Sequence, residues 1–217
     1  MNSIILIYLF NNIYKIKMTE KSFDSEEESF NSELENSNET ESISINEEPE
    51  INNIELIKSI SITLNTILEE NSKLSNINDI ILKQNKMCFS SNSIPKISIY
   101  DYLKRIQTYT KIEKNTLILS LIYIDRICQK SKLKLTYYNI HRILFSAILI
   151  SIKYNEDNYY NNKYYAEIAG IKINELNSIE YNFIKLCNFQ LFVSDEIFKK
   201  YNSYLNSLGN NQSLLDI

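Results

Sequence analysis

The sequence predicts an all-α fold. Glycine and proline occur only twice each in 217 residues, which leaves few residues to form the tight turns between strands. After residue 53, apolar residues recur at spacings of three and four, the period of one helix face. Within the run IHRILFSAILISIKY, only Ser146 and Ser151 are polar between Ile143 and Ile152. A helix that is apolar on all sides belongs inside a domain, and about 10 apolar residues cannot cross about 30 Å of hydrocarbon.

The charge of the chain is distributed unevenly. Residues 19–50 contain twelve acidic side chains and one base, Lys21, and therefore sum to −11. Lys15 and Lys17 precede this stretch, and the whole chain carries −4, so residues 51–217 carry +5. The acidity thus belongs to the N-terminal part, whereas the rest is mildly basic.

The acidic stretch predicts a tail followed by one folded domain. It consists mainly of Ser, Glu and Asn and has too few apolar residues to offset the entropy of ordering. We therefore predict a disordered acidic tail over residues 1–52 and a folded domain over 53–217. The apolar run Ile4–Phe10 lacks the flanks of a signal peptide, and Met18 would make an ordinary start. We interpret residues 1–17 as an upstream extension or a mispredicted start, with a weak membrane or targeting role as the alternative.

Eight segments of the folded domain have a helical period. In the first, Ile54, Ile57, Ile60, Leu64 and Leu68 lie on one face. The fourth and fifth segments are the most apolar, and we expect them to form the core, where each buried Ile or Leu contributes about 1.5–3 kcal/mol. The predicted helices span Ile54–Leu68, Ile77–Leu82, Ile99–Tyr109, Lys114–Gln129, Tyr137–Tyr154, Lys163–Ala169, Lys172–Asn188 and Asp195–Leu205.

Several predicted boundaries carry residues that favour helix ends. Ser98 and Asp101 form a capping-box pattern, in which the Ser98 hydroxyl accepts the Asp101 N–H. Thr136 is the expected N-cap of the most apolar helix. Gly170 suits the left-handed position that follows a helix.

The cysteines and the histidine do not indicate a metal site. Cys88, Cys128 and Cys187 form no CxxC motif, and each lies within or beside an apolar segment. We interpret them as reduced, mostly buried thiols of an intracellular protein, in the nucleus or the cytoplasm. His141 is the only histidine, so zinc would need scattered cysteines as ligands. We expect neither a metal nor a cofactor.

Five blocks of the folded domain resemble a cyclin box in their order and spacing. They look specifically like the P/U-type cyclins, the class that includes the phosphate-signalling cyclins of fungi. The block ISITLNTILEEN (Ile60–Asn71) also resembles the helix that this class carries before the box, so the resemblance covers residues 54–205. The five blocks are IPKISIYDYLKRIQTYT (Ile94–Thr110), LILSLIYIDRI (Leu117–Ile127), LTYYNIHRILFSAILISIKY (Leu135–Tyr154), NNKYYAEIAGI (Asn161–Ile171) and ELNSIEYNFIKLCNFQLFV (Glu175–Val193).

The resemblance implies a single five-helix cyclin box with an extra N-terminal helix and a C-terminal helix. It also implies a protein that binds and activates a cyclin-dependent protein kinase and has no catalytic activity of its own. In cyclins, a lysine at the end of the third helix and a glutamate in the fifth grip the kinase, and Lys153 and Glu180 match them. In some phosphate-type cyclins, an acidic residue after the third helix meets an arginine of the kinase activation segment in place of a phosphate. Asp157 matches it, and charge-assisted carboxylate–arginine pairing is the physical basis.

Each of these residues also has a purely structural interpretation. Lys153, in the last turn of a helix, complements the helix dipole. Glu180 flanks the apolar stripe residue Ile179 and could lie on an ordinary solvated face, and Asp157 could belong to a polar loop. The positions of Lys153 and Glu180 at the border of core and surface agree with the kinase-binding interpretation.

Other matches to the family are interpreted as structural. Asp125, Arg126 and Arg105 match family positions, and charges within an apolar domain are usually paired or capped. A packing role is also expected for His141 and Arg142. The glycine pair that the family has before its fifth helix is Ala–Gly here. The apolar docking motif of larger cyclins has no clear counterpart, so we predict no substrate-docking groove of that kind.

Two other classes of function fit the sequence less well. A cyclin-fold module of the transcription machinery that binds nucleic acid is the alternative, since residues 51–217 carry +5. However, the domain has three arginines, all on apolar-rich helices, and no basic run interleaved with aromatics. An enzyme is disfavoured because no Gly-rich phosphate loop or nucleophile–histidine pattern is present. We therefore expect a protein kinase as the partner, and no nucleic acid, membrane or small-molecule substrate.

Overall fold

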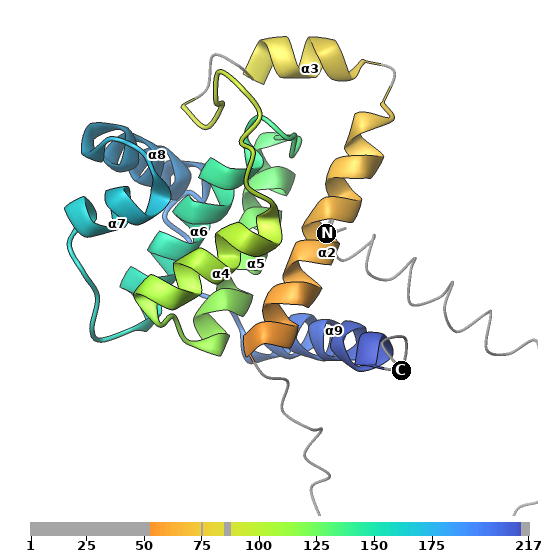
Figure 1. Ribbon diagram of the computed structural model, residues 1–217, viewed down its shortest axis with the longest axis vertical. Helices are drawn as coiled ribbons and strands as arrows, with labels where there is room; N and C mark the ends of the chain where they lie inside the picture. Colours follow the sequence, from red (N-terminus) through yellow and green to blue (C-terminus); the bar gives the residue numbers. More distant parts are fainter. Residues whose placement is uncertain (1–52, 75, 85–87, 214–217) are drawn as a thin grey trace, which may run out of the picture.

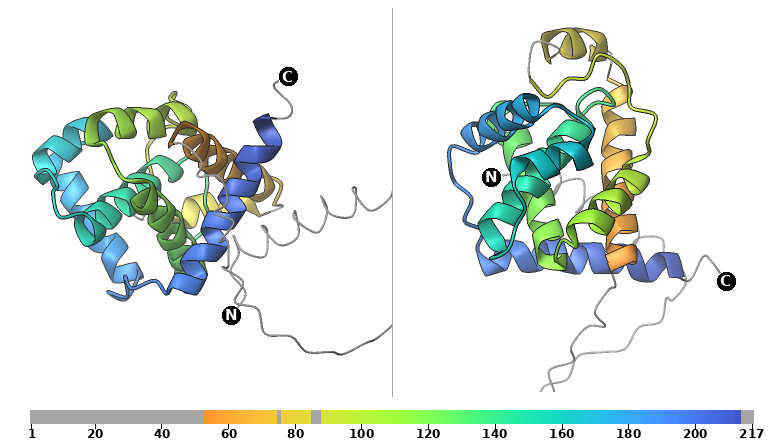
Figure 2. Two further views of the ribbon diagram at one scale, coloured as in Figure 1. Left: turned by 90° about the horizontal axis from the view of Figure 1, so that it is seen from below. Right: turned by 60° about the vertical axis from the view of Figure 1, so that its left-hand side comes forward.

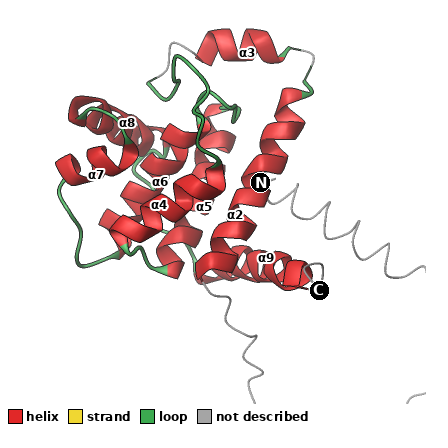
Figure 3. Cartoon of the chain, viewed as in Figure 1, coloured by secondary structure: helices red, strands yellow, loops and turns green. Residues whose placement is uncertain are grey.

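The computed structural model describes residues 53–74, 76–84 and 88–213, and all the regular elements in these ranges are helices (Figure 3). The all-α prediction is therefore confirmed. The predicted tail, residues 1–52, lies outside the described residues. The helices are α2 (Asn53–Ser72), α3 (Ile77–Gln84), α4 (Ile99–Thr110), α5 (Lys114–Ser131), α6 (Ile140–Asn155), α7 (Asn162–Ala169), α8 (Ile173–Leu186) and α9 (Asp195–Ser213).

Helix α6 is the centre of the core. Every residue from Ile143 to Ile152 is buried, including Ser146 and Ser151. The Ser146 hydroxyl donates to the carbonyl of Arg142 one turn earlier, at 2.8 Å, so this polar group needs no partner outside the helix. The helix packs against α5 and α8. The predicted central helix is therefore confirmed, and among the other described helices α5 supplies the largest share of the fully buried apolar residues.

The remaining helices surround α5 and α6. Figure 1 shows α7 and α8 on one side of α6 and α2 on the other side of the bundle. The right-hand view of Figure 2 shows α9 crossing the bundle at one end, where it packs against α2 and α5. Helices α4 to α8 are thus the five helices of the predicted box, with α2 and the short α3 before them and α9 after them. None of the described helices is both long and apolar enough to span a membrane.

The start of α6 differs from the prediction. The helix begins at Ile140 and not at Tyr137, and its N-cap residue is Asn139, so the prediction of Thr136 was wrong. The Asn139 side chain accepts the Thr136 N–H at 2.8 Å and donates to the Lys134 carbonyl at 3.0 Å. These bonds hold a separate turn before the helix, which the apolar period of the sequence does not distinguish from a first helical turn.

Helix α9 continues to Ser213, well beyond its predicted end at Leu205. Gly209 favours a helix end by propensity, yet it is buried within the helix. Tyr201 and Leu205 are also fully buried, because α9 lies against α2 and α5. Tertiary packing therefore outweighs the local preference.

Two other helix ends follow the sequence signals. The Ser98 hydroxyl accepts the Asp101 N–H at 3.0 Å and donates to the Asp101 carboxylate at 2.6 Å, which confirms the predicted N-cap of α4. Gly170 adopts a left-handed conformation (φ +72°) directly after α7, as predicted. Its N–H bonds to carbonyls of the last turn of α7.

A buried carboxylate joins α5 to α9. The Asp125 side chain accepts hydrogen bonds from the Tyr201 hydroxyl and from Gln129 Nε2, each at 2.6 Å. Asp125 is only 2 % exposed, so these donors replace the water that the carboxylate loses on folding. The structural role predicted for Asp125 agrees with this arrangement.

Replacing Tyr201 by phenylalanine should lower the free energy of unfolding by about 1–3 kcal/mol, because the buried Asp125 carboxylate would lose a donor. Urea denaturation followed by circular dichroism measures this change. Tyr181→Phe is the matched control, since the Tyr181 side chain is exposed and its substitution should change stability by less than about 0.5 kcal/mol. Equal effects of the two substitutions would contradict the role given to the Tyr201–Asp125 bond.

Candidate functional site

Lys153 and Glu180 meet at the edge of the core. Lys153 lies in the last turn of α6, where the buried helix reaches the surface, and Glu180 lies in the middle of α8. The Lys153 Nζ atom is 2.6 Å from Glu180 Oε1. The two side chains are 27 % and 14 % exposed, respectively, so the pair is partly desolvated but remains open to solvent.

The apolar stripe of α8 determines where Glu180 lies. Leu176, Ile179 and Phe183 are fully buried and seat α8 against α6. Because Glu180 follows Ile179 directly, its side chain emerges at the border of this packed face. Lys153 likewise follows a buried residue, Ile152, and its side chain emerges at the border of the core.

A third residue, Asn162, completes the polar cluster. Asn162 lies in the first turn of α7, and its Nδ2 atom donates to Glu180 Oε2 at 2.7 Å and to Asn177 Oδ1 at 2.8 Å. Both carboxylate oxygens of Glu180 are thus engaged, which restricts its rotamer. Sequence reasoning missed Asn162, because it stands among other asparagines with no periodic or charge signal.

The loop between α8 and α9 is the second part of the site. Asn188 and Phe189 have left-handed backbone conformations (φ +54° and +59°), which are uncommon for residues other than glycine. Three side chains of α5 hold this loop through its carbonyl groups. The Tyr123 hydroxyl donates to the Leu191 carbonyl at 2.8 Å, Lys130 Nζ donates to the Cys187 carbonyl at 3.1 Å, and Arg126 donates to the carbonyls of Gln190 and Phe192.

The loop presents aromatic side chains to solvent. Phe189 and Phe192 are 69 % and 77 % exposed, and they line a surface hollow of about 520 Å³ together with Tyr154, the residue after Lys153. We call these three residues the aromatic surface. Exposed large apolar side chains that cluster in this way mark interaction sites. The sequence carried a weak signal for part of this surface, since Phe189 and Phe192 follow the end of the apolar period of α8.

Asp157 lies in a different part of the surface. It is exposed just after α6 and lines a polar hollow of about 440 Å³ with the α4–α5 connection, and neither Lys153 nor Glu180 lines that hollow. The preceding residue, Glu156, has a structural role, because its carboxylate accepts the Glu113 N–H at 3.1 Å where α5 begins. Among the described residues, Asp157 itself forms no ion pair, so its carboxylate is available to a partner.

The described residues offer no cluster of His, Cys, Asp and Glu that could bind a metal ion. All three cysteines are free thiols, and Cys128 and Cys187 are buried. Burial raises the pKa of the Cys128 thiol to about 12 and that of the Cys187 thiol to about 11, so both remain protonated near neutral pH. These thiols pack within the core.

The chain is similar to known cyclins. A family model described as Cyclin matches residues 16–191. PHO85 cyclin-7 of Saccharomyces cerevisiae is 32 % identical over 177 residues, which cover 73 % of this chain and 62 % of the yeast protein. Cyclin-U2-1 of Arabidopsis thaliana is 36 % identical over 118 residues, which cover 54 % of this chain and 53 % of the plant protein. The chain thus spans a little over half the length of these two relatives.

A third relative is matched over more of its length. Cyclin-U4-1 of Arabidopsis thaliana is 30 % identical over 159 residues, which cover 72 % of this chain and 79 % of the plant protein. Cyclin-P3-1 of rice is 30 % identical over 138 residues, which cover 64 % of this chain and 58 % of the rice protein.

The Lys153–Glu180 pair should contribute more to stability than an exposed pair of the same length. A double-mutant cycle with Lys153→Met and Glu180→Gln, followed by urea denaturation, should give a coupling free energy of about 1–2 kcal/mol. The control is the Glu196–Lys200 pair of α9, also 2.6 Å long but with side chains 78 % and 54 % exposed, which should give less than about 0.5 kcal/mol. Equal coupling in the two cycles would show that partial burial adds nothing to the Lys153–Glu180 pair.

Proposed function

Because the chain belongs to the cyclin family, we propose that it is a regulatory subunit that binds and activates a cyclin-dependent protein kinase. The matches to U- and P-type proteins confirm the narrower resemblance inferred from the sequence blocks. The observation that carries the proposal is the ion pair between Lys153 and Glu180, formed at the surface by the two helices on which the family's kinase-binding residues lie. In this proposal the kinase supplies the catalytic groups.

The ion pair is suited to contact a partner because its geometry is fixed while part of its hydrogen-bonding capacity remains unused. Lys153 Nζ has three N–H groups, of which one is directed to Glu180 Oε1. Glu180 is held by Lys153 and Asn162, and each of its oxygens retains a further acceptor site. The pair can therefore offer both a donor and an acceptor to the backbone of a docked segment without losing its own bond.

The aromatic surface supplies apolar area beside these polar groups. Tyr154 directly follows Lys153, and Phe189 and Phe192 lie on the same hollow as Tyr154. Aromatic anchors next to a few oriented polar groups are typical of the residues that dominate binding energy in protein interfaces. We propose that an apolar segment of the kinase covers this hollow.

Asp157 is proposed to act on the kinase after docking. Its exposed carboxylate lies on a different hollow from the ion pair. We propose that it pairs with an arginine of the kinase activation segment, in place of a phosphate group. A charge-assisted, bidentate bond of this kind would hold the segment in one conformation.

PHO85 is the first kinase to test, because the yeast relative is named as a cyclin of PHO85. Purified chain and kinase are mixed, and the dissociation constant is measured by surface plasmon resonance. Lys153→Glu and Glu180→Lys should each weaken binding at least tenfold, because each leaves an unmatched charge in the interface.

The double variant Lys153→Glu/Glu180→Lys separates an interface role from a folding role. It keeps an ion pair within the chain, so folding is retained, but it presents reversed charges to the kinase. We expect binding to remain at least tenfold weaker than in the wild type, whereas the corresponding exchange of Glu196 and Lys200 on α9 should leave binding unchanged. Recovery of wild-type affinity in the Lys153–Glu180 exchange would refute the assigned surface.

Asp157→Asn should reduce kinase activity without changing the affinity of the complex. The amide keeps the shape of the side chain but removes the charge that pairs with arginine. Phosphorylation of a peptide substrate at saturating cyclin concentration should fall at least fivefold, while the dissociation constant stays within twofold. Asp195→Asn, at an exposed position on α9, is the control. If both variants activate the kinase like the wild type, Asp157 has no part in activation.

A further inference from the structure

A cavity on another face of the molecule is lined by basic groups. Its volume is about 310 Å³, at the lower end of the range for small-molecule sites of about 300–1,000 Å³. Arg105 of α4 and His141 and Arg142 of α6 line it, together with Tyr102, and its lining includes no acidic residue. Lys153 and Glu180 do not line this cavity, so it is separate from the proposed kinase-binding site.

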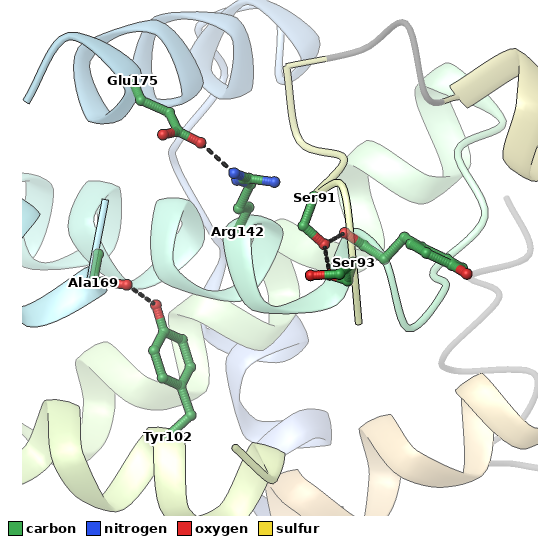
Figure 4. A network of polar contacts seen from close by, with 7 residues as sticks. Ser91, Ser93, Tyr102, Arg142, Ala169 and Glu175 are labelled. Carbon is green, nitrogen blue, oxygen red and sulfur yellow. Dashed lines mark hydrogen bonds and ion pairs between the residues drawn. The ribbon is translucent and has the colours of Figure 1, made fainter. Parts of the chain in front are cut away.

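Arg142 is only partly neutralised. One terminal nitrogen of its guanidinium group pairs with Glu175 of α8 (Figure 4). The Nε and Nη1 atoms are buried and have no hydrogen-bond partner within the described part of the chain. A buried donor without an acceptor costs about 1–3 kcal/mol, so an acceptor that reaches these atoms would be bound favourably. Figure 4 places Ser91 and Ser93 on one side of Arg142, and the contact between Tyr102 and Ala169 on another.

His141 adds a group of the opposite hydrogen-bonding type. Its Nε2 atom lies 2.9 Å from the Ile97 carbonyl, and because a carbonyl only accepts, Nε2 must carry the proton. Burial lowers the pKa of His141, so the imidazole is neutral near pH 7 and Nδ1 is an acceptor. This Nδ1 atom is also buried without a hydrogen-bond partner among the described residues.

Arg105 and the start of α6 make the cavity electropositive. The Arg105 side chain is exposed, and it donates a hydrogen bond to a neutral group, the Glu167 carbonyl, at 3.3 Å. His141 and Arg142 lie in the first turn of α6, where the helix dipole is positive, and the N-cap residue Asn139 provides no side-chain hydrogen bond to this end. The cavity therefore combines positive charge with two lining residues, Arg142 and His141, that carry unused donors and one unused acceptor just beneath its surface.

We propose that this cavity binds a small oxyanion that also carries a hydroxyl group, either a phosphate ester or a hydroxycarboxylic acid. The oxyanion would accept hydrogen bonds from Arg142 and Arg105, because guanidinium groups match the geometry of phosphate and carboxylate oxygens. The hydroxyl group of the ligand would donate to His141 Nδ1. The proposal goes beyond kinase binding and does not depend on it.

The test uses the only histidine of the chain as a probe. The tag-free full-length protein, labelled with ¹⁵N and ¹³C, is titrated with glycerol 3-phosphate and, separately, with malate. The imidazole signals of His141 are followed by NMR at constant pH, with sodium chloride of equal ionic strength as the reference. We expect a saturable shift of these signals with at least one of the two anions, and the anion that causes it distinguishes a phosphate ester from a hydroxycarboxylic acid.

Two matched variants on α4 locate the binding. Arg105→Gln removes the exposed guanidinium group and should weaken binding about tenfold. Lys104→Gln removes the same charge from the neighbouring exposed residue, which does not line the cavity, and should change the affinity less than twofold. The proposal is wrong if the His141 signals move no more with either anion than with chloride, or if the two variants bind alike. Because no kinase is present, neither result bears on the proposed kinase binding.

Discussion

The complete burial of α6 is the constraint on which the rest of the structure depends. Since its middle accepts no charged residue, the charged residues of this helix lie at its two ends, Arg142 and Lys153. Each end pairs with a glutamate of α8, Arg142 with Glu175 and Lys153 with Glu180. The apolar stripe of α8 packs the helix onto α6, and the two ion pairs join α8 to both ends of the central helix. The proposed kinase-binding site contains Lys153 at one end of this buried helix, and the proposed anion-binding cavity contains Arg142 at the other.

The proposed kinase-binding surface is built from rigid elements and not from a flexible loop. The ion pair lies on two packed helices, and Asn162 of α7 restricts the Glu180 carboxylate. The exposed phenylalanines are on a loop, but α5 holds that loop in an unusual backbone conformation. An interface whose groups are already oriented loses less conformational entropy on binding. The groups of this surface are therefore already oriented in the unbound protein.

Much of this architecture could be predicted from the sequence, because apolar period and cap residues directly report burial and helix ends. The buried α6, the Ser98 cap and the turn at Gly170 all follow from such signals. The pairing of Lys153 with Glu180 needed the family resemblance, since spacing alone does not show which helices meet. The left-handed backbone of Phe189 and the contact of Asn162 could not be predicted, because neither residue type indicates that role.

The way in which α5 holds the α8–α9 loop determines which of the loop side chains can be replaced. Tyr123, Arg126 and Lys130 donate hydrogen bonds to main-chain oxygens of the loop, which every amino acid possesses. The exposed side chains of Phe189 and Phe192 can therefore change without loss of these bonds, whereas the Gln190 side chain also accepts a hydrogen bond from Lys130. Substitutions at these two positions would change the apolar area of the aromatic surface and leave the scaffold that holds the loop unchanged.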